Sequence, residues 1–124
     1  MAIFDTNIMI DYLSGSKKAE SFILKYGEAE AIGITSITAY ELVKGISDID
    51  EELLVKLFER VRIFDVTLSV AWTAGKLHRS LKASGKTLGE ADLLIAATAF
   101  ANDETLVTQD KDFKRLGTKQ VVVI

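Results

Sequence analysis

Four acidic residues, far apart along the chain, are the side chains whose type and spacing could do chemistry. Asp5, Glu41, Asp92 and Asp110 each lie at or just past a point where a short apolar run gives way to a helical pattern. In a parallel α/β domain these junctions share one edge of the sheet, so the four acids can meet in space. Carboxylate oxygens suit hard divalent cations, and a chain with no Cys and a single His offers few other ligands. The pattern favours a metal-dependent reaction on phosphate.

Helix capping is the competing explanation for each acid taken alone. Asp is a preferred N-cap residue, and the helix dipole favours acids in a first turn. Asp5 precedes a helical pattern, and Asp110 precedes a turn at Lys111. Two capping boxes can also be drawn, Thr38-Ala39-Tyr40-Glu41 and Thr87-Leu88-Gly89-Glu90. Any single acid is therefore explained without a functional site.

Asp92 is the acid that fits no capping pattern. It opens a helix that continues Leu93-Leu94-Ile95-Ala96-Ala97, and a carboxylate on a buried helix is costly unless it is paired or metal-bound. Asp5 ends a strand near the start of the chain, where right-handed crossover folds usually place the central strand. Capping explains each acid, but it does not explain why all four point to one edge. A ligand set of oxygens alone suits Mg²⁺ or Mn²⁺, which can activate a water for attack on phosphorus.

The composition is that of an ordinary globular chain, and we expect one domain over residues 1–124. The sequence is 48% hydrophobic and 27% charged, with a formal charge of −3 from 15 Lys+Arg and 18 Asp+Glu. This is not the basic balance of a duplex-DNA binder, but metal could neutralise several acids, so nucleic acid is not excluded. The start lacks a signal-peptide pattern, and the longest apolar stretch, residues 93–101, falls short of the roughly 20 residues that span a bilayer. We expect a soluble, cytoplasmic protein without a membrane segment.

Short apolar runs alternate with helical patterns, which predicts a three-layer α/β/α domain with a parallel sheet. The expected strands are Ala2–Asp5, Ile32–Thr35, Arg62–Val66, Thr105–Thr108 and Gln120–Ile124. The expected helices are Thr6–Leu13, Ser16–Tyr26, Ser36–Gly45, Glu51–Arg60, Leu68–Ala83 and Glu90–Ala101, with a last turn over Lys111–Leu116. Glu90–Ala101 is apolar nearly all round and should be the most buried helix.

Several helix ends are also predicted. Gly27 should end the second helix, Ser36 or Thr38 should cap the third, and Asp48 or Asp50 should start the fourth. Leu68–Ala83 should bury Ala71, Ala74, Leu77 or His78, and Leu81 along one side.

Four short motifs, in order along the chain, carry the candidate acids. They are Phe4-Asp5-Thr6-Asn7, then Thr35-Ser36-Ile37-Thr38-Ala39-Tyr40-Glu41-Leu42 with Gly45 closing the helix, then Asp92-Leu93-Leu94-Ile95-Ala96-Ala97, and finally Thr108-Gln109-Asp110-Lys111-Asp112-Phe113. Together they resemble the motifs of PIN-domain ribonucleases, specifically the VapC-type toxin of a toxin–antitoxin pair. Each string alone is weak, but four in order over essentially the whole chain are specific.

The resemblance implies a site, a reaction and partners. Asp5, Glu41, Asp92 and Asp110 would hold Mg²⁺ or Mn²⁺ for endonucleolytic hydrolysis of RNA by a metal-activated water. Thr6, Asn7 and Thr108 would support the site by hydrogen bonds, Asp112 would be a further acid behind the ligands, and Glu90 is a cap first and a site neighbour second. The resemblance also implies a PIN-like sheet of order 3-2-1-4-5, a homodimer, and a cognate VapB-like antitoxin whose tail covers the active-site groove.

Two other classes of function compete with this one: phosphoryl transfer through an aspartyl-phosphate at Asp5, and a module without enzymatic activity. A phosphatase of the haloacid-dehalogenase type needs a second Asp two residues after the nucleophile, and that position is Asn7. A receiver-like domain would use Asp65 beside an acidic pair after the first strand, where only Asp5 is available. The non-enzyme alternative is a catalytically silent PIN-like interaction module, and the four intact acids argue against it.

Three further residues have expected places. His78 is expected at the surface or an interface, and Trp72 in the core or a dimer interface. Lys44 is expected on a solvated helix face, within reach of a substrate phosphate.

Overall fold

A computed structural model describes residues 1–26, 32–46 and 51–124. Its centre is a five-stranded sheet in the order β3-β2-β1-β4-β5. The strands are β1 (Ala2–Phe4), β2 (Ile32–Thr35), β3 (Arg62–Phe64), β4 (Thr105–Thr108) and β5 (Val121–Val123). All four pairings are parallel, so the carboxyl ends of the strands share one edge. The predicted fold class and strand order are confirmed, with β1 at the centre.

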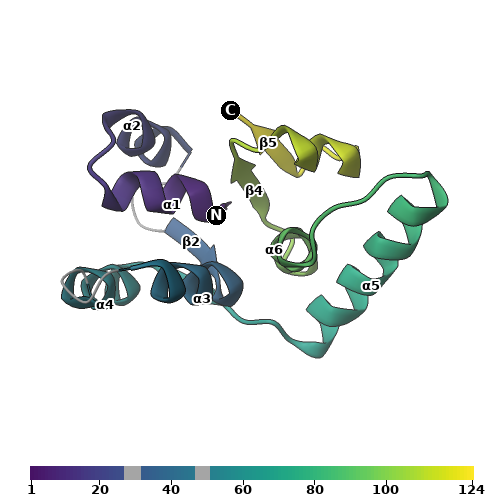
Figure 1. The fold of residues 1–124 in the computed structure, drawn as a ribbon, viewed down its shortest axis with the longest axis horizontal. Coiled ribbons are helices and arrows are strands. Elements are labelled where there is room, and N and C mark those ends of the chain that lie inside the picture. The colour runs from purple at the N-terminus through teal and green to yellow at the C-terminus, as the bar shows by residue number, and fades with distance from the viewer. Residues whose placement is uncertain (27–31, 47–50) are drawn as a thin grey trace.

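Helices cover both faces of this sheet (Figure 1). One face is packed by α1 (Thr6–Leu13), α2 (Lys17–Tyr26), α3 (Ser36–Gly45) and α4 (Glu51–Arg60). The other face is packed by α5 (Leu68–Ala83), α6 (Glu90–Ala101) and the 3-10 helix η2 (Lys111–Leu116). The result is the expected three-layer arrangement.

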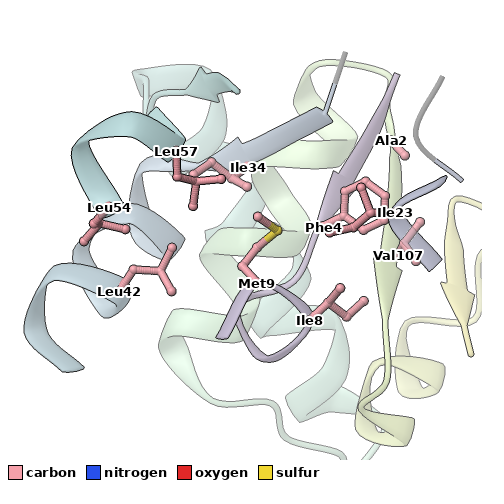
Figure 2. Close-up of a cluster of buried hydrophobic side chains, with 10 residues drawn as sticks. All are labelled: Ala2, Phe4, Ile8, Met9, Ile23, Ile34, Leu42, Leu54, Leu57 and Val107. Carbon is pink, nitrogen blue, oxygen red and sulfur yellow. The ribbon is translucent and has the colours of Figure 1, made fainter. Parts of the chain in front are cut away.

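Successive side chains of each strand point to opposite faces of the sheet, so the strands contribute to two separate hydrophobic clusters. Ala2 and Phe4 belong to the cluster under α1 to α4, which Figure 2 shows, whereas Ile3 between them belongs to the cluster under α5 and α6. Val107 and the preceding Leu106 divide in the same way on β4. Strands buried on both faces need continuous apolar runs, which is why these segments lack a polar residue at every second position.

Three strand-to-helix junctions are capped by the residue that ends the extended segment. The Asp5 carboxylate accepts from the Thr6 N–H at 2.8 Å, and the Asp110 carboxylate accepts from the Asp112 N–H at 2.8 Å. Thr35 Oγ1 accepts from the Thr38 N–H at 3.0 Å. Each cap starts its helix at the carboxyl edge of the sheet, so the polar residues of the first turn gather there.

Three strands are shorter than predicted. β1 ends at Phe4 because Asp5 already caps α1, although its N–H still bonds to the Val107 carbonyl at 2.9 Å. β3 ends at Phe64, beyond which the Val66 N–H bonds to the Ser36 hydroxyl at 3.3 Å. β5 covers Val121–Val123 and not Gln120–Ile124.

The two predicted capping boxes are wrong. Thr38 lies inside α3, whose N-cap is Thr35, so neither Ser36 nor Thr38 has the capping role. α6 begins at Glu90 after Gly89, which makes no side-chain cap hydrogen bond. The predicted stop at Gly27 and the predicted starts at Asp48 and Asp50 lie outside the described residues.

The two long C-terminal helices differ in how well the sequence predicted them. α6 buries Leu93, Ile95, Ala96, Ala97, Thr98 and Ala99, more than any other helix in the described ranges. On α5 the buried stripe runs through Val70, Ala74 and Leu81, so the predicted burial of Ala71 and the alternative burial of His78 are wrong. Trp72 is 69% exposed, so its predicted place in the core is also wrong. In the part of the chain that the structure describes, no helix is long and apolar enough to cross a membrane.

Candidate active site

The four candidate acids line one cavity of about 270 Å³ at the carboxyl edge of the sheet. Asp5 ends β1, Glu41 comes from α3, Asp92 from the first turn of α6 and Asp110 from the loop after β4. The remaining lining residues are Thr6, Asn7, Ile10, Lys44 and Gly45. The structure thus brings together side chains that span residues 5 to 110, while their chemical roles stay predictions.

Asp5 is the most enclosed of the four acids. Its side chain is 4% exposed and is held by two hydrogen bonds, from the Thr6 N–H at 2.8 Å and from the Thr108 hydroxyl at 2.7 Å. Burial raises the pKa of Asp5 above its usual value, and the charges of Asp110 and Glu41 add to this. The two hydrogen bonds oppose the rise because they stabilise the charged form. Thr108 thus forms a hydrogen bond with Asp5, and its supporting role in the site stays a prediction.

Asp92 is the acid whose pKa is raised by burial and by the charges of all the other acids of the site. Burial, and then the negative charges of Asp5, Asp110, Glu41 and Asp112, raise the pKa of Asp92 to about 6. Burial is the largest cause of this shift, and the repulsion from the nearby carboxylates adds to it. Asp92 is thus poised to respond to any cation that enters.

Glu41 is oriented by a hydroxyl from another helix. The Thr6 hydroxyl donates to Glu41 Oε1 at 2.8 Å, which connects α1 to α3, and the supporting role of Thr6 in the site stays a prediction. Thr6 Oγ1 also lies 2.9 Å from Thr38 Oγ1, and Thr38 in turn contacts Thr35. Sequence analysis missed Thr35 and Thr38 as neighbours of the site. Thr35, Thr38 and Glu41 follow one another at intervals of three residues, and this spacing is the signal that could have found the two threonines.

The other predicted residues lie at different distances from the cavity. Asn7 is exposed and lines it, whereas Asp112 is exposed and forms an ion pair with Arg115 at 3.2 Å. Glu90 is exposed and lines a separate hollow of about 210 Å³ between α5 and α6, together with His78. The structure therefore does not bring Glu90 into the carboxylate cavity, and Glu90 caps no helix through the predicted box.

The chemistry of the donor set fits a hard divalent cation. Every ionisable side chain on the cavity except Lys44 is a carboxylate, and oxygen ligands are those that Mg²⁺ and Mn²⁺ prefer. Across residues 1–26, 32–46 and 51–124, no three acidic or histidine side chains are already arranged to hold one ion. Burial raises the pKa of Asp92 most, and repulsion between the acids adds to the rise; a cation between the acids would relieve this repulsion.

Comparison with known proteins places the chain in a family. The sequence profile of the PIN domain matches residues 2–119, and the chain belongs to the PIN domain family.

Its similar relatives include proteins named as VapC ribonucleases. "Ribonuclease VapC1" of Methanocaldococcus jannaschii is 33% identical over 116 residues, which cover 92% of this chain and 79% of that protein. "Ribonuclease VapC19" of Mycobacterium tuberculosis is 30% identical over 109 residues, which cover 87% of each chain. Among solved structures, a toxin–antitoxin complex from Klebsiella pneumoniae aligns with a TM-score of 0.82 and 29% identity, and covers 99% of this chain and 97% of that one.

Proposed function

We propose that this chain is a metal-dependent endoribonuclease, formed by a single PIN-like domain over residues 1–124, that hydrolyses RNA phosphodiester bonds. The observation that carries the proposal is the grouping of Asp5, Glu41, Asp92 and Asp110 on one cavity. The relatives named as ribonucleases support the choice of RNA as the substrate.

Asp5, Glu41, Asp92 and Asp110 would hold the Mg²⁺ or Mn²⁺. When bound, such an ion lowers the pKa of a water and neutralises charge on the phosphate. The protein's own contribution is to fix the carboxylates: Thr108 and the Thr6 N–H hold Asp5, and the Thr6 hydroxyl holds Glu41. Fixed ligands need no reorganisation when substrate arrives.

Lys44 gives the cavity a place for the substrate phosphate. It is the basic side chain among the lining residues, and it follows Glu41 by one helical turn on α3. Without a cation the four acids would repel a phosphate, so Lys44 alone would not suffice to bind RNA there. We therefore expect the metal-free protein to be inactive.

The decisive experiment is RNA cleavage by the purified protein with Mg²⁺, with Mn²⁺ and with a chelator. Asp5→Asn and Asp92→Asn should each lose cleavage, by on the order of a hundredfold or more, because each removes a carboxylate that would hold the metal. Glu90→Gln is the matched control, since Glu90 is an exposed acid near Asp92 that lies off the cavity. Retained cleavage in both Asn variants would show that the site is wrongly assigned.

We further propose that a VapB-like antitoxin binds beside this site. An apolar groove of about 410 Å³ runs between α1, α3 and α4, and it shares Ile10, Glu41 and Gly45 with the carboxylate cavity. Leu53 on its wall is 48% exposed, so the groove offers apolar surface to a partner. The similarity to a solved toxin–antitoxin complex supports a peptide segment as the occupant.

The antitoxin proposal has its own test. A small DNA-binding protein encoded beside this chain should co-purify with it and inhibit RNA cleavage. Leu53→Lys should weaken that association while RNA cleavage by the free protein persists, because Leu53 lies on the groove and not on the cavity. Cleavage that continues unchanged in the purified complex would contradict the proposal.

A further inference from the structure

Thr38 is a buried hydroxyl that the capping of α3 does not explain. Its side chain is fully buried, and its N–H is already satisfied by the Thr35 cap at 3.0 Å. Its hydroxyl lies 2.9 Å from Thr6 Oγ1, across the contact between α3 and α1. A valine would fill the same space without burying a polar group, so the hydroxyl needs another explanation.

Three threonine hydroxyls form one chain that ends on Glu41. Thr35 Oγ1 donates to Thr38 Oγ1 at 3.4 Å, and Thr6 Oγ1 donates to Glu41 Oε1 at 2.8 Å. Each hydroxyl can donate one hydrogen bond, and the Thr6 hydroxyl already donates to Glu41. In the contact between Thr6 and Thr38 the donor must therefore be Thr38. The hydrogen bonds therefore run in one direction, from Thr35 through Thr38 and Thr6 to Glu41.

Thr98 provides the comparison within the same chain. It is also fully buried in a helix, but its hydroxyl donates to the Leu94 carbonyl of its own helix at 2.6 Å, the usual local bond of a helical threonine. Thr38 lies in the first turn of α3, and its hydroxyl bonds to a residue on a different helix. One buried threonine thus satisfies itself locally, and the other is tied to the candidate site.

We propose that Thr38 is a positioning residue that orients Glu41 through Thr6. The donor from Thr38 occupies the oxygen of the Thr6 hydroxyl, which leaves the Thr6 proton directed at Glu41 Oε1 and holds that carboxylate towards the cavity. Without it, the Thr6 side chain is free to turn to another rotamer, and Glu41 loses its fixed direction. The inference rests on the proposed function, in which Glu41 helps to hold the metal ion.

The test measures Mn²⁺ affinity by calorimetric titration of the metal-free, full-length protein. Thr38→Val keeps the shape of the side chain but removes the hydroxyl, and should weaken Mn²⁺ binding by about tenfold, the lower end of the effect of removing a partner of a metal ligand. Thr38→Ser keeps the hydroxyl and should bind Mn²⁺ as the wild type does. Thr98→Val removes a buried hydroxyl away from the cavity and should also leave Mn²⁺ affinity unchanged.

A purely structural role for Thr38 gives a different pattern. Thr38→Ser, which leaves a gap in the packing, would then lower the melting temperature and the Mn²⁺ affinity at least as much as Thr38→Val. A double variant distinguishes the positioning role of Thr38 from a purely structural one. In a Thr6→Val background, Thr38→Val should have no additional effect on Mn²⁺ affinity, because the Thr6 hydroxyl that links Thr38 to Glu41 is already absent.

The outcomes also separate this inference from the proposed function. Wild-type Mn²⁺ binding and RNA cleavage, with unchanged Mn²⁺ affinity in Thr38→Val, would overturn the role of Thr38 and leave the ribonuclease proposal intact. A wild-type protein that neither binds Mn²⁺ nor cleaves RNA would overturn both. Loss of Mn²⁺ affinity in Thr38→Val, rescued in Thr38→Ser, is the result we expect.

Discussion

At the scale of single residues, the candidate site is defined by repulsion between acids that the fold holds together. Asp5 is buried at the end of the central strand, and Asp92 faces it from α6 with a pKa raised to about 6. Neither acid is neutralised by a basic partner in any described ion pair. Residues that cost stability in the free protein are typical of functional sites, where the ligand offsets the cost.

Asp92→Asn should stabilise the metal-free protein while it abolishes RNA cleavage. The folded state holds the Asp92 proton more tightly than the unfolded chain, in which the pKa is near 3.8. The contribution of Asp92 to stability is therefore fully present below about pH 4 and is lost as pH rises to about 6. At pH 7 the variant should be more stable by about 1–2 kcal/mol, a value reduced from the full shift because the side chain is partly solvated.

Urea unfolding in chelator at pH 4 and pH 7 checks this. The gain in stability from Asp92→Asn should be large at pH 7 and should shrink at pH 4, where Asp92 of the folded wild type is protonated and no longer carries a charge. Glu90→Gln, at an exposed position in the same helical turn, should show no such pH dependence. A gain that is equal at both pH values would mean that repulsion at Asp92 is not its cause.

At the scale of elements, α3 carries Glu41 and Lys44 of the site, and β2 sets the position of α3. Gly33, in β2, lies between β1 and β3, where a Cβ would come within 3.0 Å of the Ala2 carbonyl and 3.0 Å of the Phe64 ring. β2 then carries Thr35 to the sheet edge, where α3 begins. The close approach of these three strands therefore fixes where Glu41 lies.

Gly33→Ala should destabilise the protein by about 1–3 kcal/mol, because the added methyl group has no space against backbone and ring atoms. Gly75→Ala on α5 is the control, since nothing lies within 4 Å of its Cβ and alanine favours a helix by about 0.5–1 kcal/mol. The melting temperature should therefore fall in Gly33→Ala and rise in Gly75→Ala, as measured by thermal unfolding. Equal melting temperatures would show that the strands can separate to accept the methyl group.

Lys44 on α3 should contribute a phosphate contact to RNA binding. With Mn²⁺ and a cleavage-resistant single-stranded RNA analogue, Lys44→Gln should lower affinity for the RNA and reduce the salt dependence of binding by about 0.7 in the log–log slope. Lys82→Gln, in the last turn of α5 and off the cavity, should change neither. Fluorescence anisotropy with a labelled RNA at several salt concentrations gives both quantities.

The sequence predicted elements better than it predicted connections between them. Asp5 and Asp110 could be placed because the strand ends are marked by apolar runs and share one edge in any parallel sheet. The hydrogen bond between Thr38 and Thr6 could not be predicted, because it joins residues 32 positions apart and depends on how α1 packs against α3. The same ambiguity made Thr38-to-Glu41 resemble a capping box, when Glu41 in fact accepts from Thr6. The core alternative for Trp72 was wrong because the apolar stripe of α5 can be drawn in more than one register, whereas its place in a dimer interface stays a prediction.

At the scale of the whole molecule, the acids come from all three layers, so metal binding should raise the free energy of unfolding of the entire domain. Mg²⁺ or Mn²⁺ at about a hundred times its Kd should stabilise the protein by about 2.7 kcal/mol, or about 10 °C in Tm for a chain of this size. Differential scanning calorimetry with and without chelator measures this. Asp92→Asn should lose most of the increase, and an equal increase in that variant would place the ion elsewhere.

The homodimer implied by the family resemblance stays a prediction. Leu68 and Trp72 are 82% and 69% exposed, four residues apart on α5, and they give variants with which to examine it. Sedimentation of the wild type and of Trp72→Ala would report the oligomeric state.

The hydrogen bond between Asp5 and Thr108 joins residues 103 positions apart, and β1 pairs with β4 only when both are present. A ribosome that has released only the first hundred residues has therefore exposed three of the four acids but no strand to enclose Asp5. The nascent chain cannot assemble the cavity until synthesis has passed Asp110, so the candidate site is among the last features of the fold to form during translation.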